Sequence, residues 1–373
     1  MAFLFMTIAA FCISCSTEDR DALQLTQEQK YSYEEQEVFF RNEEANITLA
    51  GTLTTPNLSR PLASVILIPN SSTDRDETAG RHRTLRVLAT HIAQRGLIVL
   101  RSDSRGIGQS EGPAWPANTK EDIASDIEAA IAYLQRRSDT SPTKIGLIGH
   151  SEGASIATMV ASRSPDVAFV IMLAGPGLPG SRVLCSQIDR VAKSFGVKDP
   201  VVDRYVRLIQ AATRILREQP EISLARTDLK RLFDKYLAHS TESERSALAS
   251  SGYKIPDNSA NFANGILFPW MKDFLLYDPY QDLIQVKCPL LSLIGEKDMQ
   301  VVADSNSIAI RKALEEGGNQ DATVRVLPGL NHLLQTAQTG SPVEYDQIAE
   351  TMSETALETI SSWLFTQTPL LTK

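Results

Sequence analysis

The pentapeptide from Gly149 to Gly153, "GHSEG", places a serine between two glycines. An apolar run of strand length, "KIGLIG" (144–149), leads into it, and an alanine-rich helical run, "EGASIATM" (152–159), follows. Glycines on both sides let a strand and a helix approach closely, and so tight a turn lifts the serine hydroxyl above the sheet edge. The same turn points the backbone N–H of Glu152 at that space. The spacing predicts that Ser151 is a nucleophile.

A serine hydroxyl needs a histidine to accept its proton and a carboxylate to orient that histidine. In the fold that this motif suggests, the chain order is serine, acid, histidine. The five histidines are His82, His91, His150, His239 and His332. His82, His91 and His150 precede the serine, and His150 also cannot reach round to the hydroxyl. His239 falls in a helical segment. This leaves His332, in the loop "LPGLNH", as the predicted base.

Two carboxylates compete for the role of the acid. Glu296 and Asp298 both follow the apolar run "PLLSLIG" (289–295) within four residues. Asp298 is the predicted acid, because the preceding loop residues give the chain room to turn this carboxylate toward His332. Glu296 stays open as the alternative.

A developing oxyanion needs a second N–H donor besides Glu152, and each donor is worth roughly 10²–10³ in rate. The donor should come from the loop that follows the apolar run "ASVILIP" (63–69). The backbone N–H of Ser71 or Ser72 is the predicted donor, with Asn70 bracing the loop.

These residues must be positioned by alternating strands and helices. Strands are predicted at 37–42, 47–56, 63–69, 97–103, 144–150, 167–175, 289–298 and 323–329, and helices at 83–95, 122–137, 151–164, 307–318 and 343–365. This alternation predicts the α/β class, with a mostly parallel sheet and helices on both faces. No strand-like run occurs in 181–280, so we expect one sheet domain (37–180 and 281–370) interrupted by a helical cap before the last two strands.

The charge pattern separates the cap from the rest of the chain. Residues 181–280 hold 15 Lys and Arg against 12 Asp and Glu, whereas the whole chain has a net charge of −8. An acidic chain is a poor partner for nucleic acid, which requires clustered positive charge. A slightly basic cap would favour anionic substrates. The alternative is that the excess of Lys and Arg in 181–280 only reflects helix faces in contact with solvent.

The first fifteen residues, "MAFLFMTIAAFCISC", are apolar and uncharged. They are typical of an export signal, followed by a tether over 16–36. The sequence "CISC" before "STED" resembles a bacterial lipoprotein signal, which implies a periplasmic or membrane-anchored protein with a lipid on Cys15. An apolar tail on a cytoplasmic protein is the alternative.

The two remaining cysteines, Cys185 and Cys288, have no metal-ligand spacing and form no disulfide framework. Buried thiols are the favoured interpretation, and a bridge between them stays open. Neither a metal nor an organic cofactor is implied, and the sequence indicates no oligomeric state.

The motifs around these residues resemble those of the α/β-hydrolase superfamily over about residues 37–366. The stretches "LIPNSSTDRDE", "SDSRGIGQSEG" (102–112) and "MLAGPGLPG" (172–180) look more narrowly like bacterial esterases related to serine aminopeptidases and acyl-thioester hydrolases. The resemblance implies an eight-stranded sheet and a triad of Ser151, Asp298 and His332. It also implies that the turn containing Asp103 and Arg105 braces the loop beside the nucleophile.

A small-molecule carboxylic ester is therefore the expected substrate, cleaved through an acyl-enzyme. Aminopeptidase and thioesterase activities use the same groups and remain alternatives. A non-catalytic binding module is a remote alternative, because every position of the triad is filled.

Overall fold

The computed structural model describes residues 30–58, 62–70, 72–253 and 255–367. The predicted signal (1–15) with Cys15, most of the predicted tether (16–36) and Ser71 lie outside the described residues. Within the described residues, no helix is long and apolar enough to cross a membrane.

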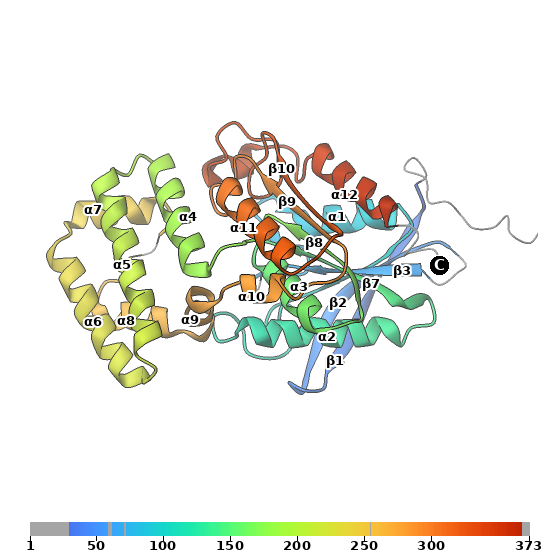
Figure 1. The fold of residues 1–373 in the computed structure, drawn as a ribbon, viewed down its shortest axis with the longest axis horizontal. Coiled ribbons are helices and arrows are strands. Elements are labelled where there is room, and N and C mark those ends of the chain that lie inside the picture. Colours follow the sequence, from blue (N-terminus) through green and yellow to red (C-terminus); the bar gives the residue numbers. More distant parts are fainter. Residues whose placement is uncertain (1–29, 59–61, 71, 254, 368–373) are drawn as a thin grey trace, which may run out of the picture.

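An eight-stranded sheet forms the centre of the molecule (Figure 1). Its strands are β1 (Tyr33–Asn42), β2 (Ile47–Pro56), β3 (Leu62–Ile68), β6 (Ile98–Ser102), β7 (Thr140–His150), β8 (Val167–Leu173), β9 (Leu290–Gly295) and β10 (Ala322–Leu327). Their spatial order is β1-β2-β6-β3-β7-β8-β9-β10. The hairpin β1–β2 and the pair β2–β6 are antiparallel, and every pair from β6 to β10 is parallel. The predicted mostly parallel sheet is confirmed.

Helices cover both faces of this sheet, which explains why its central strands are apolar throughout. The helices α1 (Thr84–Ala93) and α12 (Glu354–Thr366) pack on one face. The helices α2 (Lys120–Gln135), α3 (Glu152–Arg163) and α11 (Ala303–Glu316) pack on the other. After β3 the chain passes first to β6 and then to β7, on opposite sides of β3. Such a switch point leaves a crevice at the carboxyl ends of the strands, where ligands of α/β proteins bind.

A group of helices lies between β8 and β9 (residues 180–276), beside one end of the sheet in Figure 1, and we refer to this segment as the cap. The cap comprises α4 (Gly180–Ser194), α5 (Asp199–Glu218), α6 (Ile222–Ala238), α7 (Glu242–Ser250), α8 (Ser259–Leu267) and α9 (Pro269–Leu276). It has a hydrophobic core of its own, in which the rings of Phe233 and Phe262 stack at 4.5 Å. The short α10 (Tyr280–Leu283) leads back to the sheet, and its Leu283 belongs to the core beneath α3 and α11.

The predicted final helix from 343 to 365 is wrong in its first half. A short 3-10 helix (Pro342–Gln347) ends at Ile348, whose backbone is extended, and α12 begins only after Ser353. The intervening segment bonds elsewhere: the carbonyl of Glu350 accepts a hydrogen bond from the Gln335 side chain. Ser353 caps the new helix by accepting the N–H of Ala356. A two-stranded ribbon, β4 (Thr78–Ala79) and β5 (His82–Arg83), was also not predicted.

Cys185 and Cys288 are free thiols, so the bridge left open by the sequence is absent. Cys185 lies in α4 within the cap core, whereas Cys288 precedes β9 in the sheet domain. Burial raises the pKa of each thiol to about 11, so both are protonated and unreactive at neutral pH.

Candidate active site

Ser151 lies between the end of β7 and the first residue of α3, at the sharp turn that the sequence predicts. Its φ of 54° and ψ of −117° are unusual for a residue with a side chain. Such a conformation costs about 1–3 kcal/mol and persists only where its surroundings fix it. Here the N–H of Ser151 donates to the carbonyl of Leu173 in β8 at 2.8 Å, and its carbonyl accepts the N–H of Ala154 at 3.1 Å. The hydroxyl is thereby held at the carboxyl edge of the sheet.

Two glycines allow the close contact behind this turn. A Cβ on Gly149 would lie 2.1 Å from the carbonyl oxygen of Gly153. A Cβ on Gly153 would lie 2.2 Å from the carbonyl oxygen of Ile68 at the end of β3. Both distances are far below van der Waals contact, so neither position accepts a side chain without moving the backbone.

His332 and Asp298 meet Ser151 in a continuous chain of hydrogen bonds. Nε2 of His332 lies 3.2 Å from Oγ of Ser151, and Nδ1 lies 2.8 Å from Oδ2 of Asp298. The other carboxylate oxygen of Asp298 accepts the backbone N–H groups of Gln300 and Val301, each at 2.8 Å. Both the imidazole and the carboxylate are buried. The structure thus brings together the three residues that the sequence singles out.

Glu296, the alternative acid, points to a different partner. Its carboxylate accepts the N–H of Gly329 at 2.8 Å, and its side chain is exposed. Gly295 brings the two loops together here, because a Cβ at that position would lie 2.3 Å from the carbonyl oxygen of Leu330. Glu296 therefore holds the loop of His332 in place, and of the two candidate acids only Asp298 contacts the imidazole.

Asn331 braces the loop that carries His332. This fully buried side chain accepts the N–H groups of Leu333 and Gln335, both at 3.0 Å, and donates to the side-chain oxygen of Gln335 at 2.9 Å. The backbone N–H of Asn331 also donates to the carbonyl of Gln335. Because these bonds close a tight turn around His332, the imidazole is oriented by more than its carboxylate partner.

The loop after β3 corrects part of the oxyanion prediction. Asn70 braces this loop, as expected, and its side-chain oxygen accepts both the N–H of Ser72 at 3.1 Å and the Ser72 hydroxyl at 3.0 Å. The N–H of Ser72 is therefore engaged within the loop, which contradicts its assignment as an oxyanion donor. Ser71, the other candidate, lies outside the described residues.

A buried ion pair between Glu77 and His150 connects the three loops of the site. Oε2 of Glu77 lies 2.9 Å from Nδ1 of His150, and Oε1 accepts the N–H of Asn70 at 3.2 Å. Nε2 of His150 donates to the carbonyl of His332 at 2.9 Å. Burial alone would lower the pKa of His150, but the Glu77 carboxylate, the His332 carbonyl and the charge of Asp298 together raise it to about 9. His150 is therefore a cation at neutral pH and cannot act as a base there.

A second ion pair fixes the far end of the loop after β3. The carboxylate of Asp103 accepts the backbone N–H of Arg75 at 2.9 Å and pairs with its guanidinium at 2.6 Å. The guanidinium of Arg105 pairs instead with Asp122 and Asp126 on α2. The bracing role that the resemblance implies for this turn therefore belongs to Asp103.

A cavity of about 180 Å³ opens beside Ser151. Its walls come from both the sheet domain and the cap, and most of them are apolar or aromatic. The apolar wall includes Pro176, Leu178, Val183, Leu184, Met271 and Val301, and the aromatic wall consists of Trp270, Phe274 and Tyr277. A small acyl group fits such a space.

Comparisons with known proteins agree with this geometry. The family model described as serine aminopeptidase, S33, matches residues 77–243, which include Ser151. Esterase EstD of Thermotoga maritima is 26% identical over 327 residues, which cover 86% of this chain and 67% of EstD. The solved α/β hydrolase GrgF from Penicillium sp. sh18 superposes with a TM-score of 0.51 at 16% identity, over 80% of this chain and 91% of GrgF. The chain therefore has the fold of the α/β hydrolases. The esterase Pf2001 of Pyrococcus furiosus shares the fold as well, with a TM-score of 0.51 and 16% identity over 90% of this chain and 92% of the other.

The charged side chains on the polar wall of the hydrolase's cavity pair with each other. Nζ of Lys120, the first residue of α2, lies 3.4 Å from Oε1 of Glu152 and 3.2 Å from Oδ2 of Asp273. The ammonium also lies 5.1 Å from the ring centre of Phe274, a cation–π distance. Trp270 donates its indole N–H to the same Glu152 oxygen at 2.7 Å. The acidic side chain next to the nucleophile is therefore paired before any substrate enters.

Sequence reasoning about the hydrolase missed Lys120, Trp270 and the side chain of Glu152. The Glu152 carboxylate, inside the nucleophile motif, was a visible signal, because a buried acid requires a partner. Its partners come from α2 and α9, and no local spacing pairs residues so far apart in the chain.

Proposed function

We propose that this hydrolase cleaves carboxylic esters of small to medium acyl groups through an acyl-enzyme. The unbroken chain of hydrogen bonds from Ser151 through His332 to Asp298 carries the proposal, because it ends on a hydroxyl that borders an apolar cavity. The relative EstD and the structural neighbour Pf2001 are both named esterases, which supports the same reaction.

In the proposed mechanism, Ser151 Oγ attacks the acyl carbonyl while His332 Nε2 accepts the hydroxyl proton. The carboxylate of Asp298 stabilises the imidazolium that forms. His332 then returns the proton to the leaving alkoxide, and the C–O bond of the ester breaks. Water, deprotonated by the same imidazole, attacks the acyl-enzyme and releases the acid, which restores the Ser151 hydroxyl.

The negative oxygen of the tetrahedral intermediate requires fixed donors. We assign the first donor to the backbone N–H of Glu152, which begins α3, where the helix dipole also favours negative charge. The second donor is assigned to the loop after β3, at Ser71, since the N–H of Ser72 already donates to Asn70.

The charges of the cavity favour a neutral ester over a peptide with a free amino terminus. An aminopeptidase needs an unpaired carboxylate for the substrate's ammonium group. Glu152 is the only carboxylate among the described residues that line the cavity, and it is already bound by Lys120 and Trp270. An ammonium group would have to displace the buried ammonium of Lys120, at a large desolvation cost.

Labelling with a fluorophosphonate probe tests the nucleophile. The wild-type protein should be labelled, and the variant Ser151→Ala should not, while both melt at similar temperatures. Unlabelled but folded wild-type protein would instead favour a binding module.

A substrate panel tests the reaction class. p-Nitrophenyl esters of increasing acyl length, acyl thioesters and aminoacyl p-nitroanilides should be compared by kcat/KM. We expect the highest values for short and medium esters. A preference for the aminoacyl anilides would refute the argument from Glu152.

A further inference from the structure

The cap contains a second cavity, of about 510 Å³, between α4 and α5. Three arginines line it: Arg182 on α4, and Arg214 and Arg217 on α5. The remaining lining residues are Ser181, Cys185, Gln210, Thr213 and Glu218. Because the cavity and the arginines have no role in the proposed ester hydrolysis, they call for a separate explanation.

The three arginines are exposed, and the part of the chain that the structure describes offers them no partner. Among the described residues, none of the three forms an ion pair or a side-chain hydrogen bond, in contrast to Arg75 and Arg105 of the sheet domain. Arg214 and Arg217 stand one turn apart on α5, so their charges repel each other. Glu218 is the only carboxylate among the lining residues, which leaves an excess of two positive charges in the cavity.

The floor of the cavity adds buried polar groups to these charges. Ser181 and Thr213 are both less than a tenth exposed, at 8% and 3%. Thr213 donates its hydroxyl to the carbonyl of Ile209 at 2.9 Å. Ser181 is the second residue of α4, where the helix N-terminus carries partial positive charge.

We propose that this cavity binds a small soluble molecule that carries a phosphate or pyrophosphate group. Guanidinium groups bind phosphate oxygens in pairs of parallel hydrogen bonds. A dianionic or trianionic phosphate balances the excess charge of Arg182, Arg214 and Arg217, whereas a single carboxylate leaves repulsion between them. The hollow shape of the site suits a compact ligand rather than an extended surface.

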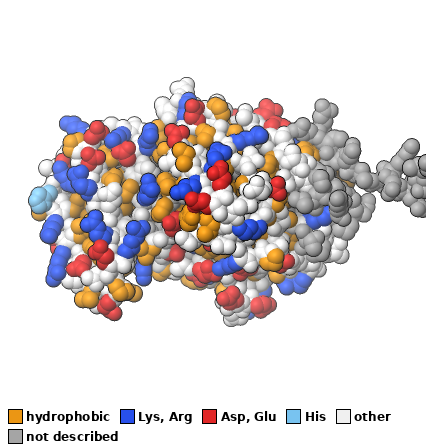
Figure 2. Space-filling model, viewed as in Figure 1, with side chains coloured by type: hydrophobic (Ala, Val, Ile, Leu, Met, Phe, Trp, Pro, Cys, Tyr) orange, Lys and Arg blue, Asp and Glu red, His pale blue; other side chains and the backbone are white. Residues whose placement is uncertain are grey.

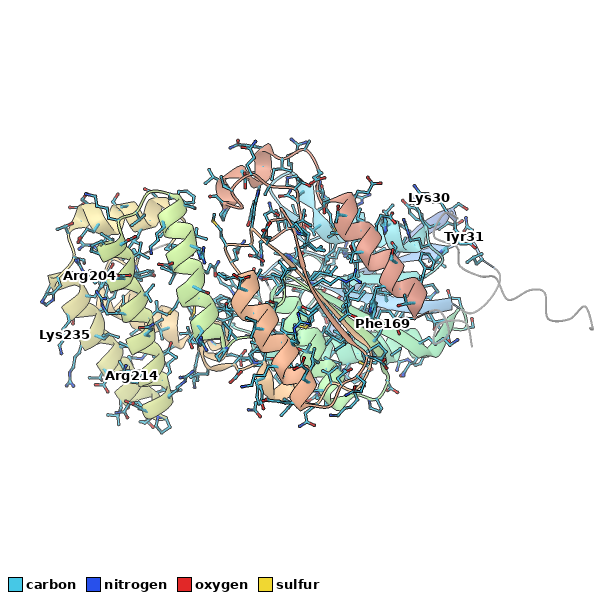
Figure 3. The ribbon with its side chains drawn as sticks, turned by 45° about the horizontal axis from the view of Figure 1, so that its top comes forward. Lys30, Tyr31, Phe169, Arg204, Arg214 and Lys235 are labelled. Carbon is cyan, nitrogen blue, oxygen red and sulfur yellow. The ribbon has the colours of Figure 1, made fainter. Side chains whose placement is uncertain are left out.

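The site is separate from the catalytic cavity, because α4 lies between the two. Val183, Leu184 and Gln187 of α4 line the catalytic cavity, while Arg182 and Cys185 line the arginine cavity, and these two sets occupy opposite sides of the helix. Figure 2 shows Lys and Arg side chains gathered over the cap, and Figure 3 shows Arg214 far from Phe169 of the sheet. One ligand therefore does not fill both cavities.

The thiol of Cys185 at this site does not offer a covalent alternative. Burial raises its pKa to about 11, so the thiol keeps its proton at neutral pH. The ligand is accordingly held by charge and hydrogen bonds alone.

Isothermal titration of the full chain with inorganic pyrophosphate tests the proposal, with acetate as the monovalent control. Wild-type protein should bind pyrophosphate, and its affinity should fall as the salt concentration is raised. It should not bind acetate measurably. The double variant Arg214→Gln/Arg217→Gln should lose about tenfold or more in affinity, as expected for charge-assisted bonds. The matched control Arg207→Gln removes an exposed charge from the same helix, outside the cavity, and should bind within about twofold of wild type.

Thermal unfolding provides a second measurement of pyrophosphate binding that does not depend on the titration. Pyrophosphate should raise the melting temperature of wild type and of Arg207→Gln but not that of the double variant. If the double variant fails to fold, the two single variants replace it. Equal losses in the control and the double variant would overturn the proposal. So would binding to vesicles of an anionic phospholipid without binding to pyrophosphate, which would identify a membrane-facing surface instead.

Discussion

Replacing Glu77 by Gln removes the carboxylate of the buried pair while keeping nearly the same shape. In the native protein the Glu77 carboxylate, helped by the His332 carbonyl and the charge of Asp298, raises the pKa of His150 from 6.5 to about 9. A raised pKa in the folded state means that the folded protein binds the proton more tightly than the unfolded chain does. The stabilisation is therefore complete below pH 6.5 and is lost as the pH rises through 9. At about 1.4 kcal/mol per pKa unit, it amounts to about 3 kcal/mol.

Urea unfolding of wild type and Glu77→Gln at about pH 5.5 and about pH 10 measures this contribution. The variant should be less stable by about 3 kcal/mol at the lower pH, and the difference should shrink toward zero at the higher pH. The control Glu128→Gln breaks a surface pair with Arg163, which stays charged over this range, so its smaller effect should not depend on pH. A Glu77→Gln deficit that is equal at both pH values would refute the reasoning, because it would assign Glu77 a role in packing alone.

Three further predictions concern the site and its supports. Asp298→Asn should lower kcat by about 10⁴-fold with the fold intact, whereas Glu296→Gln should leave kcat within about tenfold; the reverse order in a steady-state ester assay would reassign the acid. Gly149→Ala should unfold the protein or lower its melting temperature strongly, because the new Cβ would lie 2.1 Å from a backbone oxygen. The control Gly265→Ala in α8, whose Cβ would meet no atom within 4 Å, should leave stability unchanged or raise it by up to about 1 kcal/mol. Lys120→Met should cost about 3 kcal/mol in urea unfolding, because it leaves the buried carboxylate of Glu152 without its cation; unchanged stability would show that Trp270 alone satisfies that carboxylate.

The sequence predicts most of the sheet domain, because buried strands and amphipathic helices leave periodic patterns. The motif around Ser151 also predicts the tight turn found there, since its two glycines allow the strand and the helix to approach closely. His332 follows from the chain order of the triad, and Asp298 from the loop length before it. Apart from the chain order of the triad, these predictions depend on short-range patterns, which a single sequence displays directly.

The rest depends on contacts between distant segments. Residues 343–353 have the composition of a helix, which led to the wrong prediction. In the structure the side chain of Gln335 donates a hydrogen bond to the carbonyl of Glu350, which is therefore not engaged in a helical backbone bond. Ser72 is correctly placed in the loop after β3, yet the Asn70 side chain engages its N–H. His150, eliminated as a base, proves to be a charged support for that loop. No spacing rule foresees such partners.

The cap helices close around their own aromatic centre at Phe233 and Phe262, while the reacting groups belong to loops of the sheet domain. The reacting groups and the cap residues that line the catalytic cavity therefore come from separate stretches of the chain. Mutation can reshape residues 180–276 without touching Ser151, Asp298 or His332. A chimera that carries a foreign helical insert between β8 and β9 should retain the ability to be acylated while it accepts a different range of compounds.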